Sequence, residues 1–200
     1  MNTFLRYELP DGNSIRVGFV PDNLRMTQEQ FETLWEWQPI EPQQIRMSGR
    51  MIDIPRRRKA FGHNYQSSGQ TTLAAPTPEL LEQYLKWAQT AVDNRLNGLL
   101  LNCYAGEPRH YIGPHHDDTR HLFCGSPIAT ISLGQRRMFR LTREEKLDGR
   151  RMVVDKREVE VDPGIVIILP WETNLARKHS VPHFSRFRVR RISVTLRAFR

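Results

Sequence analysis

Residues 111–118 contain two overlapping His-x-Asp pairs, His115 with Asp117 and His116 with Asp118. Alternate residues of an extended strand lie on the same face, so either pair can hold one metal ion. A further imidazole, His179, follows the apolar run 165–169. Two histidines and one carboxylate form the facial triad of non-haem Fe(II) oxygenases, which leaves open positions for a co-substrate and O₂. Surface histidines beside loop acids give the same spacing, so the spacing alone does not decide between the two interpretations.

The last strand-like segment offers cations for such a site. Its polar side chains fall on alternate positions and would share one face of a strand: Arg191, Ser193, Thr195 and Arg197. A guanidinium forms two parallel hydrogen bonds with a carboxylate, so this face could bind the distal carboxylate of 2-oxoglutarate. An ordinary solvated strand face shows the same alternation.

The spacing of apolar residues predicts the helices and strands that position these residues. Thr27 and Gln30 fit a capping box that starts a helix, which Pro39 closes. A second helix starts at Thr77-Pro78, has an apolar stripe at helical spacing, and is expected to end near Gly98. After Gly98 the chain changes to short runs rich in β-formers, at residues 99–104, 128–133, 138–141, 151–154, 158–161, 165–169 and 192–199. Seven short strands predict a sandwich, barrel or jelly roll with helices contributed by the N-terminal region.

The composition limits the number of domains and the classes of partner. The chain has 200 residues with 38% hydrophobic and 26% charged residues, which fits one folded domain. Its formal net charge is +8, and 25 of the 30 basic residues are arginine. An arginine-rich basic protein suits nucleic acid or an acidic metabolite, although a solvated basic surface would give the same composition. The positive excess lies entirely after residue 54.

The compartment and the assembly are predicted from what the sequence lacks. Cys103 and Cys124 form neither a disulfide framework nor a CxxC metal motif, which favours a reducing compartment. No run approaches the about 18 apolar residues of a membrane span, and the first residues lack a signal-peptide pattern. We therefore expect a monomer that acts in the cytoplasm, or in the nucleus of a eukaryote, without a membrane partner.

The motifs, taken in order, resemble the AlkB-type 2-oxoglutarate- and Fe(II)-dependent dioxygenases, especially their nucleic-acid demethylases. The resemblance covers residues 55–197 and rests on seven pieces: Pro55-Arg56 with Phe61-Gly62, Asn102-Cys-Tyr104, Ile112-Gly-Pro-His115-His-Asp117, the segment 126–134, Arg137-Met-Phe139, His179-Ser-Val-Pro182 and the segment 191–197. One piece could arise by chance, but the ordered set is hard to explain otherwise.

The resemblance implies a fold and a set of ligands. It implies an α+β protein with a double-stranded β-helix (jelly-roll) core and N-terminal helices packed on one sheet. Residues 1–54 would be an extension of the same domain, and residues 55–200 the oxygenase domain. The implied Fe(II) ligands are His115, Asp117 and His179, so that His116 and Asp118 face away. The implied 2-oxoglutarate residues are Asn102, Tyr104, Arg191, Ser193, Thr195 and Arg197, with Ser193 standing where the family usually has Asn.

The implied reaction is oxidative demethylation of N-alkylated bases in DNA or RNA, as in DNA repair. O₂ and 2-oxoglutarate are consumed, succinate and CO₂ form, and a hydroxylated N-methyl group leaves as formaldehyde. A flipped or single-stranded base would meet Arg56, Phe61 and Tyr65 in the family's nucleotide-recognition region, with Asp118, Thr119 and Arg137 as further substrate residues. The arginines of residues 186–190 could line the same groove.

One departure from the family puts the preferred base in doubt. Repair demethylases often have an acid just beyond the His-x-Asp pair, and this chain has Thr119 there. Two alternatives therefore stay open. One is an oxygenase with the same chemistry that hydroxylates an unmethylated base, a protein side chain or a small molecule. The other is a basic nucleic-acid-binding jelly roll without activity.

Overall fold

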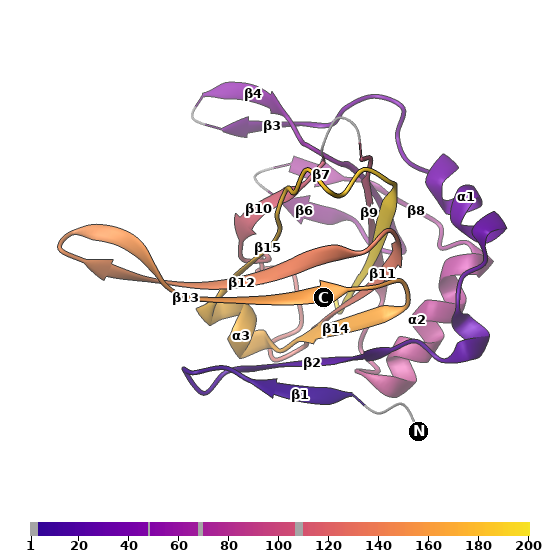
Figure 1. The fold of residues 1–200 in the computed structure, drawn as a ribbon. Coiled ribbons are helices and arrows are strands. Elements are labelled where there is room, and N and C mark those ends of the chain that lie inside the picture. Colours follow the sequence, from indigo (N-terminus) through magenta and orange to yellow (C-terminus); the bar gives the residue numbers. More distant parts are fainter. Residues whose placement is uncertain (1–3, 48, 68–69, 107–109) are drawn as a thin grey trace.

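Two β-sheets face each other at the centre of the computed structural model, which describes residues 4–47, 49–67, 70–106 and 110–200 (Figure 1). The larger sheet has eight strands in the order β1 (Leu5–Glu8), β2 (Ser14–Phe19), β14 (Ile165–Leu169), β11 (Ile128–Gly134), β16 (Arg191–Arg197), β9 (Gly98–Tyr104), β5 (Arg57–Phe61) and β8 (Ala74–Ala75). The smaller sheet has the order β10 (Ile112–His115), β15 (Lys178–Val181), β12 (Arg137–Leu147) and β13 (Arg150–Val161). All pairings in these two sheets are antiparallel except β5 with β8. The predicted strand-rich fold is confirmed, and its two facing sheets are consistent with a jelly roll.

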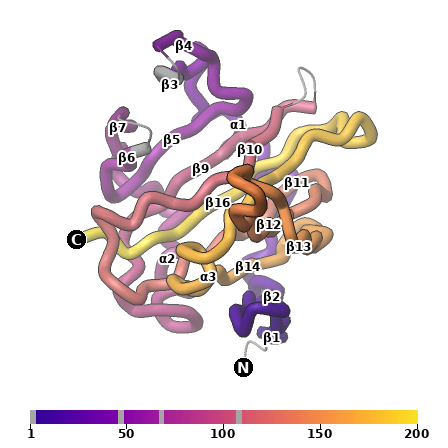
Figure 2. Tube along the Cα trace, turned by 90° about the vertical axis from the view of Figure 1, so that its left-hand side faces the viewer, coloured from indigo at the N-terminus to yellow at the C-terminus, as the bar shows by residue number. Residues whose placement is uncertain are grey.

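Two short hairpins stand outside these sheets. Strand β3 (Gln44–Met47) pairs with β4 (Arg50–Asp53), and β6 (Tyr65–Ser67) pairs with β7 (Gln70–Thr72). Both views place these hairpins at the end of the molecule away from β1 and β2 (Figures 1 and 2). The N-terminal strands thus extend one edge of the large sheet, and the hairpins follow β5 near the other edge.

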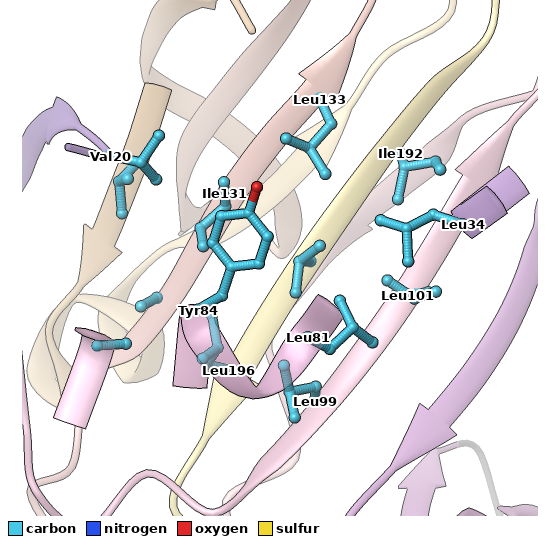
Figure 3. Close-up of a cluster of buried hydrophobic side chains, with 14 of the residues drawn as sticks. Val20, Leu34, Leu81, Tyr84, Leu99, Leu101, Ile131, Leu133, Ile192 and Leu196 are labelled. Atoms are coloured by element: carbon cyan, nitrogen blue, oxygen red, sulfur yellow. The ribbon is translucent and has the colours of Figure 1, made fainter. Parts of the chain in front are cut away.

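Two helices cover the outer face of the large sheet. Helix α1 (Gln28–Glu36) begins with the predicted capping box, in which Thr27 and Gln30 hydrogen-bond reciprocally. Helix α2 (Glu79–Ala91) follows Pro78. Their apolar stripes share one buried cluster with the outward side chains of the sheet (Figure 3), and the labelled residues are Val20, Leu34, Leu81, Tyr84, Leu99, Leu101, Ile131, Leu133, Ile192 and Leu196. The outer face of β9, β11, β14 and β16 is therefore apolar, and the polar residues of these four strands must face inward.

Helix α2 ends seven residues before the predicted cap at Gly98. Asp93 ends it, because its carboxylate accepts a hydrogen bond from the backbone of Arg95 and forms a turn. Gly98 instead begins β9, where a Cβ atom would lie 2.6 Å from the ring of Phe199. The glycine is needed for that close packing rather than for a helix cap.

The strands 151–154 and 158–161, predicted as separate, form the single strand β13. Strands β12 and β13 make a hairpin whose tip projects from the molecule at the left of Figure 1. Its solvated residues include the charged run 155–157, so the hydrophobic alternation that would reveal a strand is absent there. A short helix, α3 (Trp171–Ala176), links β14 to β15, and the 3-10 turn η1 (Asp22–Leu24) precedes α1. Among the described residues no helix has the length and apolar character needed to cross a membrane.

Candidate active site

His115, Asp117 and His179 meet between the two sheets. Strand β10 pairs with β15 so that His115 lies directly opposite His179, and their ring centroids are 4.2 Å apart. Oδ1 of Asp117 lies 3.6 Å from Nε2 of His115 and 3.9 Å from Nε2 of His179. One ligand atom from each residue falls within 4.8 Å of the others. The cross-strand register and the two-residue step to Asp117 together bring three donor atoms to one point.

The donor set fits a divalent cation. Oδ1 of Asp117 is buried without any hydrogen-bond partner, which is costly for a carboxylate unless a cation takes that place. Nδ1 of His115 lies 2.9 Å from the carbonyl oxygen of Gly113, an arrangement that leaves Nε2 free as a ligand atom. Two nitrogen donors and one carboxylate suit Fe(II).

The protonation states of the site agree with metal binding. Burial and the neighbouring His115 lower the pKa of His179 to about 3, so its ring is neutral at physiological pH. Burial would raise the pKa of Asp117, but Arg197 and the two histidines outweigh it and hold that pKa well below its usual range. Metal ligands must be deprotonated, and both of these are.

The backbone of Asp117 is held by a side chain from another element. Asn174 of α3 accepts a hydrogen bond from the Asp117 N–H at 2.9 Å and donates one to the Asp117 carbonyl at 3.1 Å. Asn174 is 1% exposed, and its own carbonyl oxygen lies 2.6 Å from Nδ1 of His116. Asp117 itself lies just beyond the end of β10, so these bonds replace a strand ladder at this position.

The inward face of the large sheet forms a polar chamber beside the metal ligands. The chamber is lined by every sequence-predicted co-substrate residue: Asn102 and Tyr104 of β9, and Arg191, Ser193, Thr195 and Arg197 of β16. The register places Arg191 opposite Tyr104 and Ser193 opposite Asn102. Ile192, Val194 and Leu196 point to the other face and belong to the helix-covered cluster, which confirms the period of two along β16.

The two arginines of the chamber differ in their partners. Arg197 donates to Oδ2 of Asp117 at 2.6 Å from Nη2 and 3.0 Å from Nε. Arg191 is 1% exposed, donates from Nε to the hydroxyl of Ser132 at 3.1 Å, and has no partner at Nη1. Burial lowers the pKa of Arg191. Arg197 also has no partner at Nη1, so both guanidinium groups keep a donor for an incoming carboxylate, but only Arg197 is engaged with the metal ligand.

Arg56 and Tyr65, two of the predicted substrate residues, also belong to this cavity. Both line it, and Nε of Arg56 donates to Oδ1 of Asn102 at 2.9 Å. The ring of Tyr65 lies near two guanidinium groups: its centroid is 4.8 Å from the guanidinium carbon of Arg197 and 5.8 Å from that of Arg58.

Four other predicted substrate residues lie outside the cavity lining. Phe61 is buried in the helix-covered cluster, with its ring 6.0 Å from that of Trp37. Arg137 is 2% exposed, donates to the carbonyl of Val189 at 2.9 Å, and stacks on Phe187.

Asp118 forms an ion pair with Arg120 at 2.5 Å, and Thr119 lies in the loop that follows. Phe61 faces the helix-covered side of the large sheet. Arg137 lies on the same strand face as Phe139, and its contacts with Val189 and Phe187 keep it out of the cavity lining.

Sequence reasoning missed four contributors to the site among the described residues. Thr130 of β11 lines the chamber opposite Thr195, and Ile167 and Leu169 of β14 form its apolar wall. Thr130 could have been found from the alternation along β11, which places it with Ser132. Asn174 carried no signal, because a six-residue helix has no readable period.

Comparisons with known proteins agree with this geometry. The model of the 2OG-Fe(II) oxygenase superfamily matches residues 19–197. The chain is 29% identical over 157 residues to DNA oxidative demethylase ALKBH2 of Mus musculus, and 28% identical over 159 residues to that of Homo sapiens. These alignments cover 76% of this chain but 65% and 60% of the relatives, so the chain spans less than two thirds of their length.

A solved structure has the same fold. The structure of OsALKBH1 superposes with a TM-score of 0.60, covering 96% of this chain and 99% of that one at 13% sequence identity. At that identity the likeness concerns the fold alone. The family model extends over most of the chain, including all three metal-ligand candidates and the whole polar chamber. The chain belongs to the 2OG-Fe(II) oxygenase superfamily, whose enzymes use Fe(II), 2-oxoglutarate and O₂, and it resembles the AlkB-type members.

Proposed function

We propose that this protein is an Fe(II)- and 2-oxoglutarate-dependent demethylase that removes N-methyl groups from bases of DNA or RNA as formaldehyde. The observation that carries the proposal is the unpartnered Oδ1 of Asp117, set between two imidazoles at the end of a chamber that also holds the unpartnered Nη1 of Arg191. A binding module has no need of either group. The similarity to DNA oxidative demethylases supports the choice of substrate.

His115, Asp117 and His179 are the residues that would hold the iron. Bound Fe(II) would supply the oxidation of a C–H bond by O₂, coupled to the decarboxylation of 2-oxoglutarate. Arg197 keeps Asp117 ionised and fixes its Oδ2, which leaves Oδ1 for the cation. Phe139 lies nearly parallel to the ring of His179, with centroids 5.8 Å apart, and limits its rotation.

The chamber residues would bind the co-substrate. Arg191 binds the distal carboxylate through its free guanidinium edge, and its burial strengthens that charge-assisted hydrogen bond. Hydroxyl and amide groups of Tyr104, Asn102 and Thr195 donate to the remaining oxygens. Ser193 is shorter than the Asn of the family and leaves room beside Asn102.

Arg56 and Tyr65 would bind the methylated base. Tyr65 offers an aromatic ring close to the guanidinium groups of Arg58 and Arg197, and Arg56 offers donors that are not used by Asn102. Stacking and edge hydrogen bonds are the usual contacts of a base that has left its stack. The substrate is therefore single-stranded nucleic acid or a flipped base.

The same proposal extends to the chain as a whole. We propose that residues 1–54 belong to the oxygenase domain, because β2 pairs with β14 and α1 packs on the large sheet. We propose a monomer with a double-stranded β-helix core, acting in the cytoplasm or in a eukaryotic nucleus, where nucleic acid is present.

A product assay tests the function. The protein with Fe(II), 2-oxoglutarate and a methylated single-stranded oligonucleotide should release succinate and formaldehyde in equal amounts. The His115→Ala variant should release neither. Succinate formed without dependence on the oligonucleotide would favour a hydroxylase with another substrate. If Fe(II) and 2-oxoglutarate did not bind, the protein would be a nucleic-acid binder without activity.

A further inference from the structure

The charged groups of the cavity are unbalanced. Among the described residues that line it, the cations are Arg56, Arg191 and Arg197, whereas the carboxylates are represented by Asp117 alone. Asp117 is already shared between Arg197 and the metal position. A divalent cation and the dianion 2-oxoglutarate would cancel each other, so loading the site leaves the positive excess in place.

A further arginine, Arg58, lies behind the residues that line the cavity and adds to its positive charge. Arg58 is 3% exposed, and its Nε has no hydrogen-bond partner. It lies opposite Asn102 across β5 and β9, and its guanidinium faces the ring of Tyr65. Burial and the nearby Arg56 lower the pKa of Arg58 to about 10, so it is still protonated at neutral pH.

The acids nearest to the metal ligands along the chain do not offset these charges. Asp118 accepts three hydrogen bonds from the guanidinium of Arg120 and is neutralised by it. The next position, Thr119, carries no charge. A base bound at this site therefore meets guanidinium groups and no free carboxylate among the described residues.

We propose, on the basis of the demethylase function above, that Arg56 and Arg58 make this site select neutral lactam bases over cationic methylated bases. Methylation of thymine at N3 or of guanine at N1 leaves a neutral ring with carbonyl oxygens beside the methyl group. Those oxygens can accept hydrogen bonds from the free donors of Arg56. Methylation of adenine at N1 or of cytosine at N3 produces a ring cation, which the guanidinium groups repel.

A competition experiment tests the selection. Two single-stranded oligonucleotides that differ only in one central base, 3-methylthymine or 1-methyladenine, are mixed with the Fe(II)- and 2-oxoglutarate-loaded enzyme. The ratio of the two products gives the ratio of kcat/KM directly and does not depend on the fraction of folded enzyme. We expect the 3-methylthymine strand to react at least about tenfold faster, because the guanidinium groups repel the charge of the 1-methyladenine ring. A tenfold ratio of kcat/KM corresponds to about 1.4 kcal/mol.

Two variants locate the cause. Arg58→Gln should lower the preference several-fold, because it removes a buried charge beside Tyr65. Arg16→Gln removes a half-buried arginine of β2 in the same large sheet, outside the cavity lining, and should leave the ratio unchanged. An equal or faster reaction of the 1-methyladenine strand with the wild-type enzyme would overturn the proposal. So would a ratio that Arg58→Gln does not change.

Binding separates this proposal from the demethylase function. The protein loaded with Mn(II) and 2-oxoglutarate under nitrogen should bind the 3-methylthymine strand more tightly than the 1-methyladenine strand in fluorescence anisotropy. If neither strand released formaldehyde, the demethylase function would be wrong, and the order of these two affinities would still support or overturn the selection.

Discussion

At the scale of the residue, the site depends on side chains that never touch the metal position. Asn174 is the clearest case, because its amide satisfies both backbone groups of Asp117 while it is itself buried. Asp117 lies outside the ladder of β10, so without Asn174 its backbone would have two buried polar groups without a partner. Residues that orient metal ligands affect affinity as strongly as many direct contacts.

Replacing Asn174 should weaken metal binding more than it weakens the fold. We expect Asn174→Ala to lower the affinity for Fe(II) or Mn(II) about tenfold or more, as for other residues that orient ligands. The matched control is Thr173→Val on the same helix, which loses a buried 2.7 Å hydrogen bond to the carbonyl of Ser14. That control should cost about 1 kcal/mol of stability and leave metal affinity unchanged. Metal titration and urea unfolding measure the two quantities, and equal metal affinities in both variants would contradict the role of Asn174.

At the scale of the element, strand β15 must be fixed at its start, because His179 is its second residue. Arg177 lies just before it with a fully buried side chain. Its guanidinium pairs with Asp11 at 2.9 Å and with Asp155 at 2.6 Å. Asp11 lies between β1 and β2, and Asp155 belongs to β13, so one side chain ties β15 to both sheets.

Removing this ion triad should destabilise the protein in a pH-dependent way. Arg177→Met leaves the partly buried Asp11 without its ion-pair partner and leaves Asp155 only the longer pair with Arg157 at 3.4 Å, which should cost about 3 kcal/mol at pH 7. Burial raises the pKa of Asp11, but its hydrogen bonds with Arg177 and Asn13 outweigh this and lower it. A lowered pKa in the folded state stabilises the fold above the unfolded value of about 4, and the effect disappears as pH falls through the folded value. The difference between wild type and variant should therefore shrink below about pH 4.

Urea unfolding at pH 7, 5 and 3 checks this expectation. Arg136→Met serves as the control, because Arg136 forms ion pairs with Asp162 and Glu160 that are about half exposed. Such surface pairs contribute about 1 kcal/mol or less, so this variant should change stability little at any of the three pH values. A loss in Arg177→Met that stays constant from pH 7 to pH 3 would contradict the ion-triad explanation.

The sequence predicted those elements that have either one buried stripe or a continuous apolar run. Helices α1 and α2 bury one stripe, which makes their period visible, whereas β9 and β14 of the large sheet are buried at every position and form short apolar runs. Strand β1 is exposed at all four positions, and β10 contains Gly113 and Pro114, which gives neither a usable period. Helix α3 has six residues, too few for a stripe.

The same limit applies to the candidate site. The alternation along β16 predicts which residues share a face, because a period of two is a local property. The partner of each side chain is not local. Arg197 binds Asp117, whereas Arg191 binds Ser132. This difference depends on the strand register between residues that are far apart in the chain. The positions of Phe61 and Arg137 away from the cavity depend on packing against helices and loops that no short pattern describes.

At the scale of the whole molecule, the arginines differ in burial and in pairing, and three groups can be distinguished. Five of the arginines whose burial the structure describes are buried, namely Arg58, Arg137, Arg177, Arg191 and Arg197. Others are paired with carboxylates on the surface, including Arg136, Arg140, Arg143 and Arg190. Arg186 and Arg188 are exposed and hold no carboxylate; Arg186 lies about 5 Å from the rings of Phe184 and Phe187. Their loop precedes β16 and lies at the same end of the molecule as the β3–β4 hairpin (Figures 1 and 2).

Exposed arginines and lysines without a carboxylate partner can release counterions from a nucleic acid, so the arginines of this loop should contribute to the salt dependence of binding. For single strands, each phosphate contact contributes about 0.7 to the slope of log affinity against log salt. Changing both Arg186 and Arg188 to Gln should therefore flatten that slope by about 1.4 for an unmodified single-stranded oligonucleotide, measured by anisotropy across a salt series. The control changes Arg6 and Arg95 to Gln, which removes the same charge from side chains already paired with Glu8 and Asp93. If both double variants flattened the slope equally, affinity would depend on net charge alone, and the loop before β16 would not be a phosphate-binding surface.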